Sequence, residues 1–332
     1  MTLRSSAPFA FTALLATVGA TAQTAPDSID AHLEAAKQAA GVDFKGTLGA
    51  LCLPNPPRAA AAAARGPAAT PARATWYARP YQVFDNLYFV GTKIHSSWAL
   101  KTSDGIILID TLFNYAAEPE IIDGLKTLGL DPATIKYVIL THGHGDHDQG
   151  VRLLQDRYHP HVVVSAQDWD LMENGPDMPG GKPKRDMVGT DGEKITLGDT
   201  TVTLVFTPGH TTGTFSLLFP VKDHGKTMVV AYSGGTLTGN FGADGARYDE
   251  YIASQKKFAQ AAAKAGATVL MSNHSEYDNA YTKARLVATR QPGDPHPSDV
   301  GADGVQRYFK VMEECTEAMK LRALMPAGAR RS

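Results

Sequence analysis

The sequence predicts an α/β fold of four layers, an αββα sandwich in which two packed mixed sheets lie between outer helices. Two observations favour it. Short apolar, β-branched runs typical of buried strands gather in two blocks around a Pro/Gly-rich loop over 174–184, and predicted helices lie outside both blocks. A loop rich in histidine and aspartate, 141–150, directly follows one of these strands, and open α/β sheets place their sites at the carboxyl ends of strands.

The first block combines alternating strands with helices that have recognisable ends. Residues 83–90 and 94–101 alternate like strands, and Gly91-Thr92 predicts the turn between them. The helix over 119–128 has Pro119 in its first turn and Gly129 at its end. The other predicted elements here are strands over 106–110, 135–140 and 161–165, and helices over 148–158 and 167–173.

The second block repeats this pattern more weakly. It contains predicted strands over 194–197, 201–206, 215–219, 228–232 and 267–271, and helices over 251–265 and 281–289. A Pro/Gly break at 291–297 precedes a closing amphipathic helix over 305–324.

Four segments are expected along the 332 residues. Residues 1–22 look like a secretory signal peptide, with Arg4 before an apolar run and an A-x-A cleavage site at its end. Residues 23–75 comprise an N-terminal helix, with Ser28 as its N-cap and Gly41 as its stop, and an Ala/Pro-rich linker. The core domain follows over 76–290. The C-terminal extension, 291–332, is expected to pack its amphipathic helix on the core.

The signal peptide predicts a periplasmic or secreted protein with no membrane association after cleavage, since no later window is apolar enough to span a bilayer. A formal charge of −2 gives no electrostatic case for nucleic acid, so the expected partner is a small-molecule substrate. Cys52 and Cys315 would form one disulfide in an oxidising compartment, or else remain two free buried thiols.

The loop after the strand over 135–140 carries an unusual density of metal-binding side chains. Three imidazoles and two carboxylates fall between His142 and Asp148, and the spacers Gly143 and Gly145 leave room for them to converge. Histidine and aspartate are ligands of zinc and related divalent metals. The pattern therefore predicts a metal site, and the alternative is a polar surface loop.

Two later histidines occupy the same local context. His210 lies in Thr207-Pro208-Gly209-His210 and His274 in Met271-Ser272-Asn273-His274, each directly after a predicted strand. We therefore expect both to complete the metal site. His95 either lines the pocket or, the favoured interpretation, faces solvent from a strand. The histidines expected at the surface beside prolines or turns are His159, His161, His224 and His296.

These motifs together resemble the metallo-β-lactamase superfamily over residues 77–290, so 76–290 is expected to be a metallo-β-lactamase-like domain. The resemblance implies two Zn²⁺ ions. It assigns the first to His142, His144 and His210, and the second to Asp146, His147 and His274. Asp146 would also orient the nucleophile, which makes it the expected catalytic residue, whereas Asp148 falls outside the matched pattern. Asp110 would not bind metal itself but would support the site through contact with a ligand histidine.

The segment after the predicted strand over 228–232 indicates which group within the superfamily this sequence resembles most. The segment 232–238 has neither the bridging Asp of lactonase-like and glyoxalase II-like members nor the Cys of the first two subclasses of class B β-lactamases. It is most similar to the third subclass, which uses only His and Asp ligands. Thr236-Leu237-Thr238 resembles a Ser-Leu-Ser-like segment of that subclass, with Thr in place of Ser, so Thr236 and Thr238 are the expected substrate-binding residues.

The resemblance implies an exported zinc-dependent hydrolase that opens a strained cyclic amide. The expected reaction is β-lactam hydrolysis by a zinc-bound hydroxide, with antibiotic resistance as its consequence. One alternative is hydrolysis of another small ester, lactone or thioester on the same fold. The other is a non-enzymatic zinc-binding protein.

Overall fold

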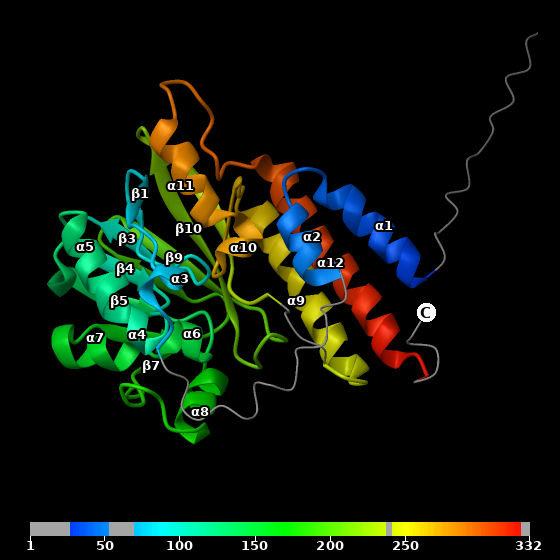
Figure 1. Cartoon of the computed structure of the whole chain (residues 1–332), viewed down its shortest axis with the longest axis horizontal. Helices are drawn as coiled ribbons and strands as arrows, with labels where there is room; N and C mark the ends of the chain where they lie inside the picture. Colours follow the sequence, from blue (N-terminus) through cyan, green and yellow to red (C-terminus); the bar gives the residue numbers. More distant parts are fainter. Residues whose placement is uncertain (1–26, 53–69, 237–240, 327–332) are drawn as a thin grey trace, which may run out of the picture.

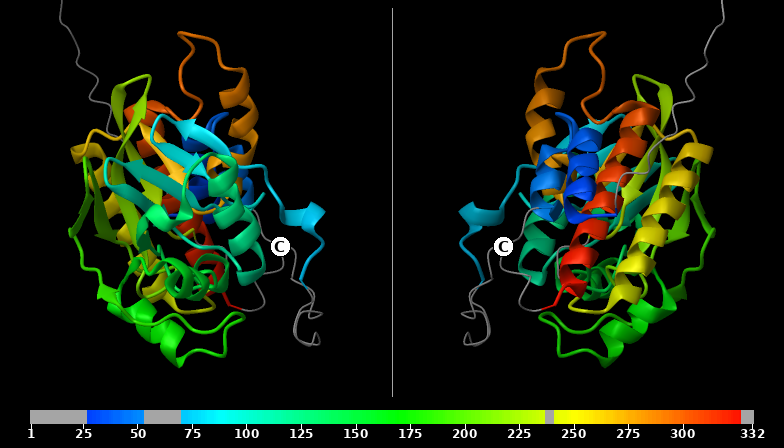
Figure 2. Two further views of the ribbon diagram at one scale, coloured as in Figure 1. Left: turned by 90° about the vertical axis from the view of Figure 1, so that its left-hand side faces the viewer. Right: turned by 90° about the vertical axis from the view of Figure 1, so that its right-hand side faces the viewer.

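Two β-sheets face one another at the centre of the molecule, and helices cover the outer face of each (Figures 1 and 2). The computed structural model describes residues 27–52, 70–236 and 241–326. The arrangement confirms the predicted αββα sandwich. The segments expected to form the signal peptide and most of the linker lie outside the described residues. Among the described helices, none combines the length and apolar character needed to cross a membrane.

The first sheet has seven strands in chain order. Its strands are β1 (Tyr81–Phe84), β2 (Leu87–Phe89), β3 (Trp98–Thr102), β4 (Gly105–Ile109), β5 (Ile135–Ile139), β6 (His161–Val164) and β7 (Met187–Val188). Pairing is antiparallel from β1 to β4 and parallel from β4 to β7. Parallel neighbours require crossover connections, and helices supply them on the outer face.

These crossovers are the helices drawn on the left of Figure 1 and the short helix below them. They are α4 (Asn114–Ala116), the π-helical turn η2 (Ala117–Ile122), α5 (Asp123–Thr127), the 3₁₀ turn η3 (Pro132–Thr134), α6 (Gly145–Asp148), α7 (Val151–Tyr158) and α8 (Ala166–Asn174).

The second sheet has five strands in the order β12-β11-β10-β9-β8. They are β8 (Lys194–Leu197), β9 (Thr200–Phe206), β10 (Phe215–Asp223), β11 (Lys226–Ser233) and β12 (Val269–Ser272). Only β11 and β12 are parallel neighbours, and the rest form antiparallel ladders.

Helices from both ends of the chain lie on the outer side of the second sheet (Figure 1). The remaining helices are α1 (Ile29–Ala40), α2 (Lys45–Cys52), α3 (Arg73–Trp76), α9 (Gly245–Lys264), α10 (Ser275–Asp278), α11 (Ala280–Thr289) and α12 (Gly301–Leu324). As predicted, Ser28 caps α1 by accepting a hydrogen bond from the backbone of Ala31, and Gly41 ends the helix with a positive φ. Cys52 and Cys315 form a disulfide that joins α2 to α12.

Three apolar layers hold the sandwich together. The inner faces of the two sheets share one core cluster, which includes Trp98, Phe215 and Tyr232. A second cluster fills the space between the second sheet and α1, α9 and α12, and a third lies between the first sheet and its crossover helices. Because helices cover both sheets, strands such as β4 and β12 are buried on both faces and contain continuous apolar runs.

The predicted strands over 83–90 and 94–101 were wrong in detail. A turn at Asp85-Asn86 divides the first into β1 and β2, and the side-chain oxygen of Asn86 accepts a hydrogen bond from the backbone of Lys222. The second strand begins only at Trp98. The backbone before it leaves the sheet because Ser96 N–H donates to the carbonyl of Asn273 (2.8 Å) on the loop after β12.

Candidate metal centre

All six side chains expected to bind metal lie together at the carboxyl ends of three strands. His142, His144, Asp146 and His147 leave the end of β5 and enter α6, His210 follows β9, and His274 follows β12. Two of these strands belong to one sheet and the third to the other sheet. The site therefore lies at one edge of the sandwich and takes residues from both sheets.

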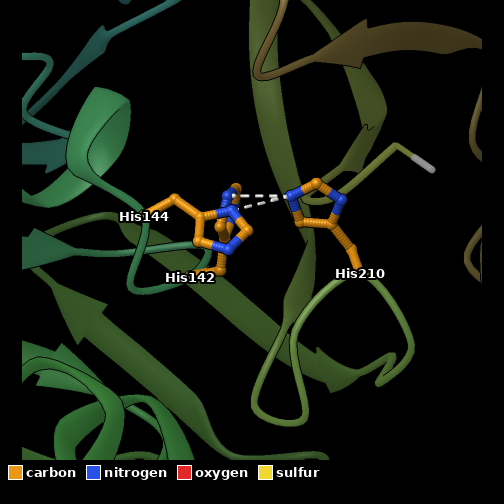
Figure 3. A group of neighbouring side chains, drawn as sticks. All are labelled: His142, His144 and His210. Atoms are coloured by element: carbon orange, nitrogen blue, oxygen red, sulfur yellow. Dashed lines mark hydrogen bonds between the residues drawn. The ribbon is translucent and has the colours of Figure 1, made fainter. Parts of the chain in front are cut away.

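The first cluster consists of His142, His144 and His210, whose rings point toward one another (Figure 3). The Nε2 atom of His210 lies 3.1 Å from His142 Nε2 and 3.1 Å from His144 Nδ1. Tetrahedral zinc with Zn–N bonds of about 2.0–2.1 Å separates its nitrogen ligands by about 3.3 Å. The three nitrogens therefore fit one shared zinc ion.

The ring of His142 is oriented from behind. Its Nδ1 atom donates to the carbonyl of Gly234 (3.0 Å), which directs Nε2 toward the other two histidines. The close approach of this backbone depends on two glycines. A Cβ on Gly235 would lie 2.8 Å from the Cβ of His210, and one on Gly234 would collide with the carbonyl of Phe215. The segment that lacks a carboxylate in the sequence is thus packed directly against the first cluster.

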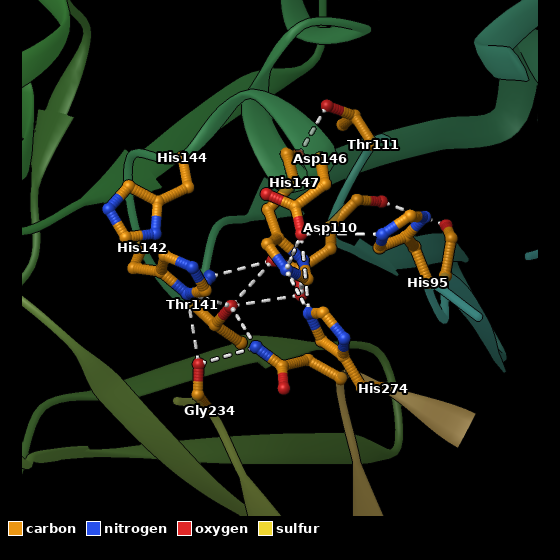
Figure 4. A network of polar contacts seen from close by, with 12 residues as sticks. His95, Asp110, Thr111, Thr141, His142, His144, Asp146, His147, Gly234 and His274 are labelled. Atoms are coloured by element: carbon orange, nitrogen blue, oxygen red, sulfur yellow. Dashed lines mark hydrogen bonds and ion pairs between the residues drawn. The ribbon is translucent and has the colours of Figure 1, made fainter. Parts of the chain in front are cut away.

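The second cluster consists of Asp146, His147 and His274 (Figure 4). Asp146 Oδ2 lies 3.3 Å from His147 Nε2 and 3.3 Å from His274 Nε2, and the two imidazole nitrogens are 3.1 Å apart. Three donor atoms at these mutual distances also fit one zinc ion. The two clusters are adjacent, since the His142 and His147 rings lie 4.4 Å apart between centroids.

Opposite charges set the protonation of the second cluster. Burial opposes ionisation of Asp146, but His147 and His274 outweigh it and lower the pKa of the carboxyl. Burial also opposes a charge on His147, but Asp146 and Asp110 raise its pKa to about 10. Without metal, His147 therefore favours its protonated form, and a divalent cation bound there would take the place of that proton.

Asp110 supports this cluster as expected. Its Oδ2 atom lies 3.1 Å from His147 Nδ1, and its Oδ1 accepts from the backbone N–H of Thr141 (2.8 Å). The carboxylate is fully buried, and the residue adopts a positive φ of 58°. The end of β4 is thus held in an unfavourable backbone conformation that aims one carboxylate at both the ligand loop and a ligand.

Asp168 is a residue at the site that sequence analysis missed. Its Oδ2 atom accepts from the backbone N–H of Gly143 (3.0 Å) and from the hydroxyl of Thr211 (2.8 Å). These two groups belong to the two loops that carry the first cluster. Nothing local in the sequence marks Asp168, because it occupies the first turn of α8, where an acidic residue is also expected for helix capping.

His95 is half-buried and faces the site, so the favoured prediction that it faces solvent was wrong. Its side chain is 18% exposed, and its Nε2 atom lies 3.5 Å from Asp146 Oδ2. The prediction failed because residues before Trp98 dock on the loop after β12 instead of continuing a strand.

His296 was also expected at the surface. It is buried instead, stacks on Phe84 and donates from Nε2 to the carbonyl of Val83.

Of the two threonines expected to bind substrate, the structure describes only Thr236. Thr236 directly follows Gly235 and is 2% exposed, and its hydroxyl has no hydrogen-bond partner among the described residues. The hydroxyl of Tyr308, from α12, lies beside it. Thr238 lies outside the described residues. The structure therefore places the side chain of Thr236 in the protein interior behind the first cluster.

Comparisons with known proteins point to one superfamily. Residues 90–224 match the sequence model of the metallo-beta-lactamase superfamily. The structure resembles BJP-1, a subclass B3 metallo-beta-lactamase of Bradyrhizobium japonicum, with a TM-score of 0.62 and 29% identity. That alignment covers 72% of this chain and 93% of BJP-1.

Curated relatives match over shorter segments. The N-acyl homoserine lactonase AttM of Rhizobium radiobacter is 34% identical over 29% of this chain and 40% of its own length. A hydroxyacylglutathione hydrolase of Synechocystis sp. is 31% identical over 43% of this chain and 53% of its own length. The chain thus spans about half or less of these two relatives. The chain contains a metallo-β-lactamase superfamily domain, as its motifs indicated, and subclass B3 β-lactamases are among its structural neighbours.

Proposed function

We propose that this protein is an exported dizinc hydrolase that opens the strained amide of β-lactams. The observation that carries the proposal is the pair of adjacent three-ligand clusters built from His and Asp alone, with Gly234 and Gly235 where related hydrolases place a bridging carboxylate. The likeness to a subclass B3 metallo-beta-lactamase over most of both chains supports the substrate class.

In this proposal, His142, His144 and His210 hold the first zinc, and Asp146, His147 and His274 hold the second. When bound, zinc supplies Lewis-acid chemistry that lowers the pKa of water and polarises a carbonyl oxygen. The chain positions the reacting groups. Asp146 remains ionised beside His147 and His274, and its carboxylate orients the attacking water.

Supporting groups keep the site in one arrangement before substrate arrives. Asp110 holds His147, the Gly234 carbonyl holds His142, and Asp168 holds the backbone between His142 and His144. Such preorganisation matters because misplaced donors lose much of their effect on the transition state.

A second candidate is hydrolysis of a lactone or thioester. The matches to an N-acyl homoserine lactonase and a hydroxyacylglutathione hydrolase favour it. Both candidates require attack on a carbonyl carbon, so they differ in the substrate that the site accepts.

The test is to measure whether the purified protein hydrolyses each of four substrates before and after a chelator removes its metal. The substrates are a cephalosporin, a carbapenem, an acyl homoserine lactone and a glutathione thioester. Chelator-sensitive β-lactam turnover that zinc restores supports the proposal. Turnover confined to the lactone or the thioester favours the second candidate. Zinc bound without turnover of any of the four makes the protein a zinc binder instead.

Export is tested by expressing the full chain in a bacterial host and sequencing the N-terminus of the periplasmic product, which should begin at Gln23.

A further inference from the structure

We propose that His95 is a fourth protein ligand of the second metal site, beside Asp146, His147 and His274. The inference rests on the proposed dizinc centre and adds a ligand that its six-residue pattern does not contain. It comes from a segment, 91–97, that lies far from the other ligands in sequence and has no metal-binding pattern of its own.

The donor atoms converge on one oxygen. Asp146 Oδ2 lies 3.3 Å from His147 Nε2, 3.3 Å from His274 Nε2 and 3.5 Å from His95 Nε2. His95, Asp146 and His274 each offer a ligand atom to one group whose members could hold a metal ion together. His95 therefore approaches the second cluster from the side that His147 does not occupy (Figure 4).

The ring of His95 is held in this orientation by its surroundings. Phe113 packs edge-on against it at 5.1 Å between centroids, and the ring of His274 does so at 5.1 Å. Its Nδ1 atom faces the hydroxyl of Thr92, which leaves Nε2 on the side of the metal site.

The backbone is anchored as firmly as the ring. His95 N–H donates to the hydroxyl of Thr92 (2.9 Å), and residues His95 and His274 form an isolated antiparallel bridge. On the two sides of His95, the Ile94 carbonyl accepts from Ser275 N–H (2.7 Å), and Ser96 N–H donates to the Asn273 carbonyl (2.8 Å). Backbone hydrogen bonds thus fix the segment with His95 against the loop with His274.

A fourth protein ligand changes what the second site can do. Catalytic zinc sites keep three protein ligands and an open position, whereas four-ligand sites are closed and bind metal more tightly. An extra imidazole would therefore close the second site with four protein ligands, and would leave the first site, with three histidines, as the more open of the two.

The test is titration of cobalt into the metal-free full-length protein, followed by visible spectroscopy, for the wild type, His95→Ala and His95→Gln. The matched control is His161→Ala, since the His161 side chain is 64% exposed and pairs with Asp186 outside the site. We expect His95→Ala to bind the second cobalt equivalent at least about 10-fold more weakly, with an altered absorption band, because removing even an outer-shell partner typically costs 10–100-fold in metal affinity. The first equivalent should bind as in the wild type, and circular dichroism should be unchanged.

His95→Gln separates a ligand from a hydrogen-bond donor. Glutamine can donate to Asp146 but is a poor zinc ligand, so a ligand role predicts weak second-site binding in this variant too. Wild-type affinity and spectrum in His95→Gln would overturn the proposal, as would an unchanged His95→Ala or a wild type that binds only one equivalent. The readout needs no substrate. A wild type that binds two equivalents but turns over no β-lactam would sink the proposed function and leave the role of His95 standing.

Discussion

The carboxylate of Asp168 accepts a hydrogen bond from the backbone N–H of Gly143, the residue between two histidines of the first cluster. The same oxygen accepts from Thr211, which directly follows His210. One side chain on α8 therefore ties together the loops after β5 and β9. The first cluster depends on this link because its three ligands come from these two loops.

Replacing Asp168 with Ala should weaken metal binding at the first cluster by about 10–100-fold, the usual effect of losing an outer partner of a metal site. Cobalt titration measures it, and Asp168→Asn should restore part of the affinity by keeping one acceptor. Asp170→Ala is the control, because Asp170 lies on the same helix but is 61% exposed and pairs with Arg185. Wild-type affinity in Asp168→Ala would show that the loops hold their positions without this link.

Replacing Asp146 with Ala should remove the second metal and leave the first. The rate should fall about 10²–10⁴-fold, the range for a positioned group that handles a proton in the transition state. Metal content by mass spectrometry and steady-state kinetics check this together. Equal loss of both metals would contradict the role assigned to Asp146.

Gly235→Ala should disturb the first cluster through a steric contact. The new Cβ would lie 2.8 Å from His210 Cβ and 2.9 Å from Thr214 Cγ2, so His210 must shift. Overpacking of this kind costs about 1–3 kcal/mol, and first-site affinity should fall with it. Urea unfolding and metal titration provide the measurements. Gly49→Ala is the control, since a Cβ there meets no atom within 4 Å.

Breaking the Cys52–Cys315 disulfide should lower the free energy of unfolding by about 2–4 kcal/mol, because the bond limits the unfolded chain. Denaturant unfolding of the double variant Cys52→Ser/Cys315→Ser, in the metal-free form, measures the change. Zinc content of the folded double variant should match the wild type, since neither α2 nor α12 carries an expected ligand. Equal stability of the two proteins would mean that packing alone holds these helices.

The buried carboxyl of Glu120 should make stability depend on pH. Burial raises its pKa to about 8, although the Ala78 N–H bonded to it acts in the opposite direction. The folded state therefore favours the neutral carboxyl. The contribution of this group to the free energy of unfolding is fully present below the unfolded pKa near 4.5, and it is lost as pH rises toward about 8. Glu120→Gln should remove this decline in metal-free protein, whereas Glu34→Gln, on an exposed side chain, should not. Parallel pH profiles for the wild type and Glu120→Gln would count against this assignment.

Much of the fold and most of the site could be predicted from the sequence because the signals are local. Apolar runs mark β4, β5 and β12, since strands covered on both faces need apolar residues at every position. The loop from His142 to His147 follows β5 directly, and four expected ligands within six residues lie near one another because they share one short loop. His210 and His274 were found because they repeat the same position after a strand.

The parts that failed depend on contacts between segments far apart in the chain. His95 reaches Asp146 only because the backbone before β3 docks on the loop after β12, a contact between residues 96 and 273 that no periodicity encodes. Asp168 reaches Gly143 only when α8 packs beside the ligand loop. Whether Cys52 and Cys315 pair was open for the same reason, since it depends on how α2 packs on α12.

The sequence by itself thus determined the fold class and predicted six metal ligands at strand ends. Hydrophobic periodicity marks the strands, and clustered His and Asp side chains, together with the resemblance to a known superfamily, mark the expected ligands. Only the tertiary structure decided which groups surround the ligands: His95 at the second cluster, Asp168 behind the first, and Thr236 in the interior. These placements result from packing two sheets and their helices together, which sets distances between residues that the chain keeps far apart.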